Sequence, residues 1–296
     1  MKQDGDPYAT AREVACPEIT ADLRSWIAEV SPNPGLFVFG VMPRSGSQFV
    51  TNLLALHPHL RRHPRDIWEI PLLTQSASMH RMTEAFFERY HFNRERLGDS
   101  GLCALLGTAF AAYLQAAAPG QRILMTQPST DYLDHFFAYF PQEHLLLLMR
   151  DGRDVVSSVV KTWPQWDFSA AAKDWANNAQ MMLRTRDLLL SQQRPVHYCT
   201  YEAATADSEA FVRGVCLALQ LDPEVYPFEK IATNVLVKGS SEFEGSNADR
   251  WKADAKPAHF KPVGRWLAWS AEQKAIFKDI AGETLIACGY ESSSDW

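Results

Sequence analysis

The feature that most constrains the fold is a short apolar run that leads directly into a loop of small polar residues. The run Leu36–Val41 reads LFVFGV and is typical of a strand buried on both faces. It stops at Met42 and Pro43, and apolar residues then recur at helical spacing over Ser47–Leu56. A buried strand joined to a helix by such a loop is the local geometry of P-loop proteins. The pattern therefore predicts an α/β fold.

Further strand segments alternate with helical ones along the chain. The additional strands are predicted at Arg122–Met125, His144–Met149 and Pro195–Thr200. Because such alternation builds a parallel sheet with right-handed crossovers, we predict a single P-loop-NTPase-like domain with a central parallel sheet flanked by helices. Residues 1–34 are polar and end in SPNPG, so we predict an N-terminal extension over 1–34 and the domain over 35–296.

Charge and cysteine content exclude several classes of partner. The formal net charge of −6 argues against a nucleic-acid or anionic-membrane binder, so any anion site must be a local cluster of basic residues. No apolar stretch is long enough to span a bilayer, and the N-terminus lacks the apolar core of a signal peptide. The 5 cysteines form no CxxC pair, which indicates reduced thiols without a disulfide framework or zinc site. We therefore expect a cytoplasmic protein.

The loop after the first strand is a candidate anion site. It reads PRSGSQF over residues 43–49, where Gly46 lets the backbone approach an anion and Arg44 adds a full charge. The N–H groups that open the helix add partial positive charge. Further side-chain donors are Ser45, Ser47 and Gln48. The loop lacks the GK[ST] of a Walker motif. The alternative is an ordinary strand–helix turn with an exposed arginine.

A second basic motif, RDGRDVVSS, follows the strand His144–Met149. Arg150 stands at the carboxyl end of that strand, the edge where open α/β sheets bind ligands, and Ser158 lies 8 residues further on. The alternative is a surface ion pair between Arg153 and Asp154. Two basic motifs at the ends of two strands of one sheet predict a ligand with two separated anionic groups.

Both motifs, in this order, resemble those of the sulfotransferases that use 3′-phosphoadenosine 5′-phosphosulfate (PAPS). The resemblance extends to Tyr201 and Glu202 after a strand, to KPVGRW at Lys261–Trp266, and to the ACGY that ends at Tyr290. It covers roughly residues 36–290. Because the loop reads RSGS rather than KSGTTW, the chain looks closer to the bacterial and tyrosylprotein-type branch than to the cytosolic phenol and steroid enzymes.

The resemblance implies a role for each motif residue. Arg44 would steady the bridging oxygen as the sulfuryl group leaves, and Arg150 with Ser158 would hold the 3′-phosphate. Lys261 would approach the phosphates, whereas Arg265 is a weaker candidate because the family's glycine-rich Arg-Lys-Gly signature is absent here. The 5′-phosphosulfate would be bound by Ser45, Gly46, Ser47 and Gln48, and the adenine would lie near Phe49 and Tyr201. For Phe49 the alternative is a core-facing helix position.

The resemblance also implies sulfuryl transfer by in-line displacement, without a catalytic metal, to an acceptor on a small molecule or a peptide. We expect a hydroxyl acceptor, with an amine as the second choice. The rivals are a P-loop nucleotide or small-molecule kinase and a non-catalytic nucleotide-binding protein on the same fold.

For the aromatic residues after the second motif, including Trp163, core packing is favoured over an acceptor pocket. The polar stretch 240–256 suits a flexible acceptor loop.

An acceptor hydroxyl needs a general base, and the sequence offers carboxylates for it. The cytosolic enzymes use a histidine in a THxP context, whereas this chain reads MTQP with Gln127. The tyrosylprotein-type enzymes use a carboxylate shortly after an HP step, and here HPHLRRHPRDIWEIP supplies Asp66 and Glu69, with His63 nearby. We prefer Glu69 because its apolar neighbours should desolvate it and raise its pKa. The alternative is that either carboxylate merely pairs with an adjacent arginine.

Overall fold

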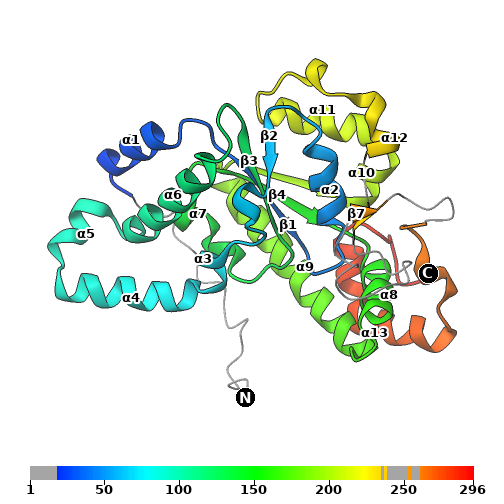
Figure 1. Ribbon diagram of the computed structural model, residues 1–296. Helices are drawn as coiled ribbons and strands as arrows, with labels where there is room; N and C mark the ends of the chain where they lie inside the picture. The colour runs from blue at the N-terminus through cyan, green and yellow to red at the C-terminus, as the bar shows by residue number, and fades with distance from the viewer. Residues whose placement is uncertain (1–18, 235–236, 239–252, 255–260) are drawn as a thin grey trace.

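The computed structural model describes residues 19–234, 237–238, 253–254 and 261–296. Its centre is a parallel five-stranded sheet with the order β2-β3-β1-β4-β5 (Figure 1). The strands are β1 Leu36–Gly40, β2 Leu60–Arg62, β3 Arg122–Gln127, β4 His144–Met149 and β5 Val196–Thr200. A separate antiparallel pair joins β6 Val237–Lys238 to β7 Ala253–Asp254. The predicted α/β fold with one parallel sheet is confirmed.

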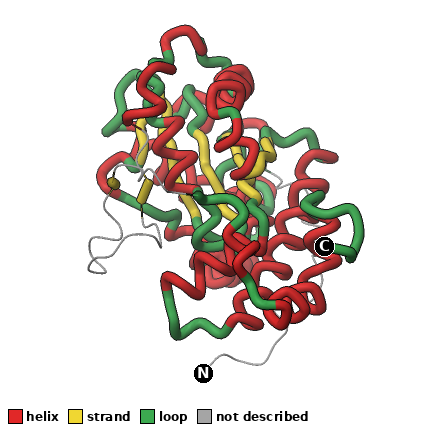
Figure 2. Tube along the Cα trace, turned by 90° about the vertical axis from the view of Figure 1, so that its right-hand side faces the viewer, coloured by secondary structure: helices red, strands yellow, loops and turns green. Residues whose placement is uncertain are grey.

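Helices lie around the sheet, and Figure 2 shows the strands in yellow among them. Those before β3 are α1 Ala21–Val30, α2 Ser47–Leu54, α3 Pro71–Thr74, α4 Ser76–Arg89, α5 Phe92–Leu97 and α6 Gly101–Gln115. Those after β3 are α7 Phe136–Tyr139, α8 Gly152–Thr162, α9 Phe168–Ser191, α10 Tyr201–Ala206, α11 Ser208–Ala218, α12 Ile231–Asn234 and α13 Ala271–Ala287. Within the described ranges, none of these helices has the length and apolar character needed to cross a bilayer.

The side chains of β1 alternate between two apolar layers, which explains why the strand is apolar throughout. Phe37 and Phe39 pack with α7, α8, α9 and α13 on one face of the sheet. Leu36 and Val38 pack with α2, α10 and α11 on the other face. All of these strand side chains are fully buried. A strand covered on both faces reads as a continuous apolar run rather than as an alternating one.

The two basic motifs leave adjacent strands toward opposite faces of the sheet. β1 pairs with β4, with Gly40 opposite Leu148. The chain then passes from β1 into α2 on one face and from β4 into α8 on the other. In open α/β sheets, divergence of this kind opens a crevice at the carboxyl ends of the two strands. The fold therefore brings the two predicted anion sites to one place.

The elements that were not predicted from the sequence include β2 and α1. β2 is an edge strand whose pairing is with β3 alone, so only Leu60 of its three residues is buried. Helix α1 lies in the predicted N-terminal extension and packs Leu23 and Ile27 against Ala104 of α6. Residues 1–18 of that extension, and all of the stretch 240–256 except the strand β7, lie outside the described residues.

Candidate functional site

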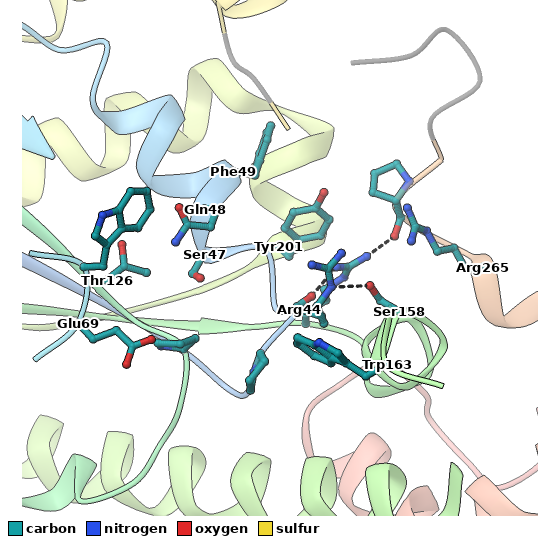
Figure 3. A pocket seen from close by; sticks show the side chains of 16 residues that line it. Arg44, Ser47, Gln48, Phe49, Glu69, Thr126, Ser158, Trp163, Tyr201 and Arg265 are labelled. Carbon is teal, nitrogen blue, oxygen red and sulfur yellow. Dashed lines mark hydrogen bonds between the residues drawn. The ribbon is translucent and has the colours of Figure 1, made fainter. Parts of the chain in front are cut away.

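A cavity of about 520 Å³ lies at the carboxyl edge of the sheet, where the two motifs meet. Figure 3 shows Ser47 and Gln48 on α2 above it, with Glu69 and Thr126 toward one end and Ser158 and Arg265 toward the other. The lining residues from the two predicted motifs are Pro43, Arg44, Gly46, Ser47, Gln48, Phe49, Arg150 and Ser158. The structure thus brings residues of both predicted anion sites to one cavity.

The loop before α2 forms an open cradle for an anion. Gly46 is the N-cap of α2 with φ of 88°, a left-handed conformation that favours glycine, and no side chain caps the helix. The first N–H groups of α2 are therefore directed at whatever the cradle binds. Ser45 does not line the cavity: its hydroxyl accepts from the Met42 N–H at 3.0 Å and donates to the Met42 carbonyl. Its side chain shapes the loop.

Tyr201 closes the cradle from α10. A Cβ added to Gly46 would overlap with the Tyr201 ring, so only glycine fits against it. Phe49 meets the same ring edge-on, with the ring centroids 5.6 Å apart, and the Arg150 guanidinium lies 4.3 Å from the ring centroid. The predicted adenine contacts Phe49 and Tyr201 are therefore neighbours at the cavity.

Arg150 ties the two motifs together. Its Nη1 donates to the Arg44 carbonyl at 2.7 Å and its Nη2 donates to the Pro262 carbonyl. Within the described part of the chain, its buried Nε has no hydrogen-bond partner. The Arg44 side chain extends to the second motif, where its Nε donates to Ser158 Oγ at 3.0 Å. Because buried donors are normally paired, the Arg150 Nε favours an acceptor bound in the cavity.

Asp154 holds the KPVGRW segment against the cavity. Its buried carboxylate accepts from the N–H groups of Gly264 at 2.8 Å and Arg265 at 2.7 Å. Burial raises the pKa of this carboxyl above its ordinary value. Arg265 consequently lines the cavity, whereas Lys261 is exposed and lies outside the lining. From the sequence, Lys261 ranks above Arg265, because the family's Arg-containing signature is absent. No local pattern in the sequence shows that Asp154 anchors the segment.

The candidate bases occupy different positions. Glu69 lines the cavity, whereas Asp66, in the turn Pro64–Asp66, does not. The expected desolvation of Glu69 by its neighbours is wrong, because its side chain is exposed. Ile70 points into the core, and Trp68 is itself 42% exposed at the cavity. The chain offers Glu69 as an accessible carboxylate.

His63 and Gln127 support the segment that carries Glu69. The Gln127 amide oxygen accepts from the Ile70 N–H at 3.1 Å, and the His63 ring stacks on Trp68 at 4.5 Å. His63 Nδ1 lies 3.2 Å from the Ile67 carbonyl and must donate to it, so Nε2 accepts from the Thr126 hydroxyl at 3.4 Å. Both ring nitrogens are therefore engaged, and the buried His63 does not line the cavity, so its position favours a supporting role over that of a base.

Sequence reasoning missed several lining residues: Trp68, Thr126 and Pro128 had no assigned role, Arg265 was ranked low, and for Trp163 core packing was favoured. They come from loops whose position depends on tertiary packing. In the parts of the chain that the structure describes, no group of three or more His, Cys, Asp or Glu side chains is placed to hold a metal ion.

Comparisons with known proteins agree with this fold. The model of the sulfotransferase family matches residues 34–224. The nodulation protein NoeE of Sinorhizobium fredii is 24% identical over 300 residues, which span 90% of this chain and 68% of that protein. The sulfotransferase domain from the Synechococcus PCC 7002 olefin synthase superposes with a TM-score of 0.56 at 19% identity, over 88% of this chain and 95% of that domain. The sulfotransferase domain from the curacin biosynthetic pathway gives a TM-score of 0.51 at 18% identity, over 84% and 97%.

Proposed function

The chain belongs to the sulfotransferase family, and we propose that it transfers a sulfuryl group from PAPS to an acceptor hydroxyl, with an amine as the second choice. The observation that carries the proposal is a single cavity that joins two cation-bearing loops to an accessible carboxylate, Glu69. A donor with two anionic ends and an acceptor that must lose a proton need such a combination.

The residues at the two loops fit the two anionic ends of the donor. In this proposal the first N–H groups of α2, with Ser47 and Gln48, bind the 5′-phosphosulfate. Arg150 and Ser158 bind the 3′-phosphate, which would supply the acceptor that the Arg150 Nε lacks among the described residues. PAPS supplies the sulfuryl group. Phe49 and Tyr201 pack beside the adenine.

Two side chains act on the reacting groups in this scheme. Arg44 neutralises charge that develops on the bridging oxygen, so its interaction is strongest in the transition state. Glu69 accepts the proton of the acceptor hydroxyl. In-line displacement places the attacking and leaving oxygens on opposite sides of the sulfur, by analogy with phosphoryl transfer. Arg44 and Glu69, which line different parts of the cavity, suit that arrangement (Figure 3).

The acceptor, in this proposal, has an apolar part beside its hydroxyl. Apolar side chains of Pro43, Trp68, Pro128 and Trp163 line the cavity together with Glu69. Such a surface favours the apolar body of a small molecule or of a peptide side chain over a heavily hydroxylated sugar.

An acceptor screen with isotopically labelled PAPS, read by mass spectrometry, tests the proposal. We expect at least one hydroxyl compound to gain a single labelled sulfo group, with the same yield in the presence of EDTA. Phosphate transfer from ATP that requires Mg²⁺ would instead identify a kinase. Tight nucleotide binding with no transfer to any acceptor would favour a non-catalytic binding protein.

A further inference from the structure

Arg62 makes an unusual set of contacts beside the cradle. It is the last residue of β2, and its guanidinium reaches across to three residues of α2. Nε donates to Thr51 Oγ1 at 3.1 Å, Nη1 donates to Asn52 Oδ1 at 2.6 Å, and Nη2 donates to the Gln48 amide oxygen. The guanidinium also lies 5.2 Å from the centroid of the Trp68 ring.

All of these partners are neutral, and no carboxylate among the described residues pairs with Arg62. Burial lowers the pKa of Arg62 to about 10, which still leaves it charged at neutral pH. Holding a guanidinium in a partly buried place without a counter-charge is unfavourable for folding. Departures of this kind from ordinary stabilising patterns occur mainly at functional sites.

The contact with Arg62 fixes the orientation of the Gln48 amide. A guanidinium has only donors, so it can face only the oxygen of the amide. The NH₂ group of Gln48 is therefore turned away from Arg62. Gln48 lines the cavity, and Figure 3 shows its side chain next to that of Ser47 at the start of α2. In this orientation the amide presents donors, and no acceptor, to an anion at the cradle.

We propose that Arg62 is a positioning residue for the sulfuryl donor: it holds the Gln48 amide so that the NH₂ group donates to an anionic oxygen bound at the start of α2. The inference rests on the proposed function, because it takes the 5′ end of the nucleotide as the bound anion. Without Arg62 the amide could rotate and place its oxygen against the anion, which would repel it.

Calorimetry with two nucleotides tests this role. 3′-Phosphoadenosine 5′-phosphate (PAP) carries the 5′ anion, and adenosine 3′-monophosphate lacks it. We expect Arg62→Met to weaken PAP binding about tenfold, the scale of one hydrogen bond to a charged group, and to leave binding of the 3′-monophosphate unchanged. Equal weakening of both nucleotides would indicate general damage to the site and would overturn the proposal.

A double-mutant cycle distinguishes an effect of Arg62 on the orientation of the Gln48 amide from a direct effect of the Arg62 charge. Gln48→Leu should weaken PAP to a similar extent, and Arg62→Met should then add no further loss in the Gln48→Leu background. A loss that persists there would mean that Arg62 acts through its charge, contrary to the proposal. Asn52→Ala is the matched control, since it removes another Arg62 partner without touching the amide, and PAP affinity should be unchanged.

Two outcomes keep this inference distinct from the proposed function. If Arg62→Met does not fold, the Gln48→Leu variant still tests the inference. Normal PAP binding by Gln48→Leu would show that the amide does not donate to the bound anion, and the inference would then be wrong. If the unaltered protein itself fails to bind PAP, the proposed donor is wrong. If it binds PAP and both variants bind PAP equally well, only the inference about Arg62 is wrong.

Discussion

Arg44 has a backbone conformation that is unusual for a residue with a side chain. Its φ of 77° lies in the left-handed region, where a residue other than glycine loses about 1–2 kcal/mol. The surrounding loop maintains this conformation through the three Ser45–Met42 hydrogen bonds and through the bond from Arg150 to the Arg44 carbonyl. Strain retained in this way is typical of residues whose placement serves function.

Substitutions at Arg44 should therefore separate activity from stability. We expect Arg44→Ala to lower turnover more than donor affinity, since a charge at the bridging oxygen matters most as the bond breaks. Arg44→Lys should retain part of the turnover, because it keeps the charge. Arg44→Gly should lose activity as Arg44→Ala does, yet melt no lower than the unaltered protein because glycine relieves the strain. Full turnover of Arg44→Ala at saturating donor would contradict the assignment.

The two carboxylates after the cradle provide a matched pair. Glu69→Gln keeps the shape of the side chain but removes its basicity, and should lower turnover by about 10²–10⁴-fold with PAP affinity unchanged. Asp66→Asn should leave turnover unchanged, because Asp66 does not line the cavity. Steady-state kinetics and calorimetry check both variants. Normal turnover of Glu69→Gln would show that the base is another group or that the acceptor needs none.

Among single residues, those that belong to contiguous motifs could be predicted from the sequence. Arg44, Gly46 and Gln48 could be identified because a cradle loop and its helix are local in the chain. Arg62 was given no site role and Arg265 was ranked low, since their positions depend on contacts across 14 and 111 residues, with Gln48 and Asp154 respectively. Tertiary packing also places Glu69, and not Asp66, at the cavity.

Among the strands and helices, those with the most deeply buried apolar residues were the easiest to predict from the sequence. β1, β3 and β4 were recognisable from the sequence because their apolar runs are long enough to reveal strands covered on both faces. β5 is an edge strand in which only Val196 is buried, and its position after a breaker was the main signal. β2 was missed because an edge strand of three residues, two of them arginine, has no such run. α1 was missed because only Leu23 and Ile27 of its ten residues are buried, which leaves a weak helical pattern.

A histidine pair at the β4–β5 edge should make stability depend on pH. His144 Nδ1 and His197 Nε2 lie 3.2 Å apart, and the rings are stacked. Burial, and then the nearby His197 and Arg122, lower the pKa of His144 from 6.5 to about 4. The unfolded chain therefore binds more protons between pH 4 and 6.5, so the contribution of His144 to the free energy of unfolding rises with pH over that window.

Chemical denaturation at several pH values tests this assignment. Below pH 6.5 the unaltered protein should lose stability more steeply with acid than the His144→Gln variant, whose residue 144 does not titrate. The difference between the two curves should level off at low pH, once both states of His144 are protonated. Parallel curves over the whole range would show that the histidine titrates normally in the folded state.

At the scale of the whole molecule, topology and charge act together. The chain carries a net charge of −6, yet Arg44, Arg150 and Arg265 all line one cavity, so its potential is set locally. This is possible because β1 and β4 are adjacent and their following helices cover opposite faces of the sheet. Two motifs more than 100 residues apart thereby become the two ends of one site.

We propose that this site recognises two anionic groups of one nucleotide at once. Isothermal titration calorimetry of the full chain with PAP and with AMP, under identical salt, tests it most directly. Because PAP engages both the α2 cradle and Arg150, we expect it to bind at least about tenfold more tightly than AMP, and the Arg150→Ala variant to lose most of that difference. AMP binding as tightly as PAP would show that the site does not recognise both anionic groups.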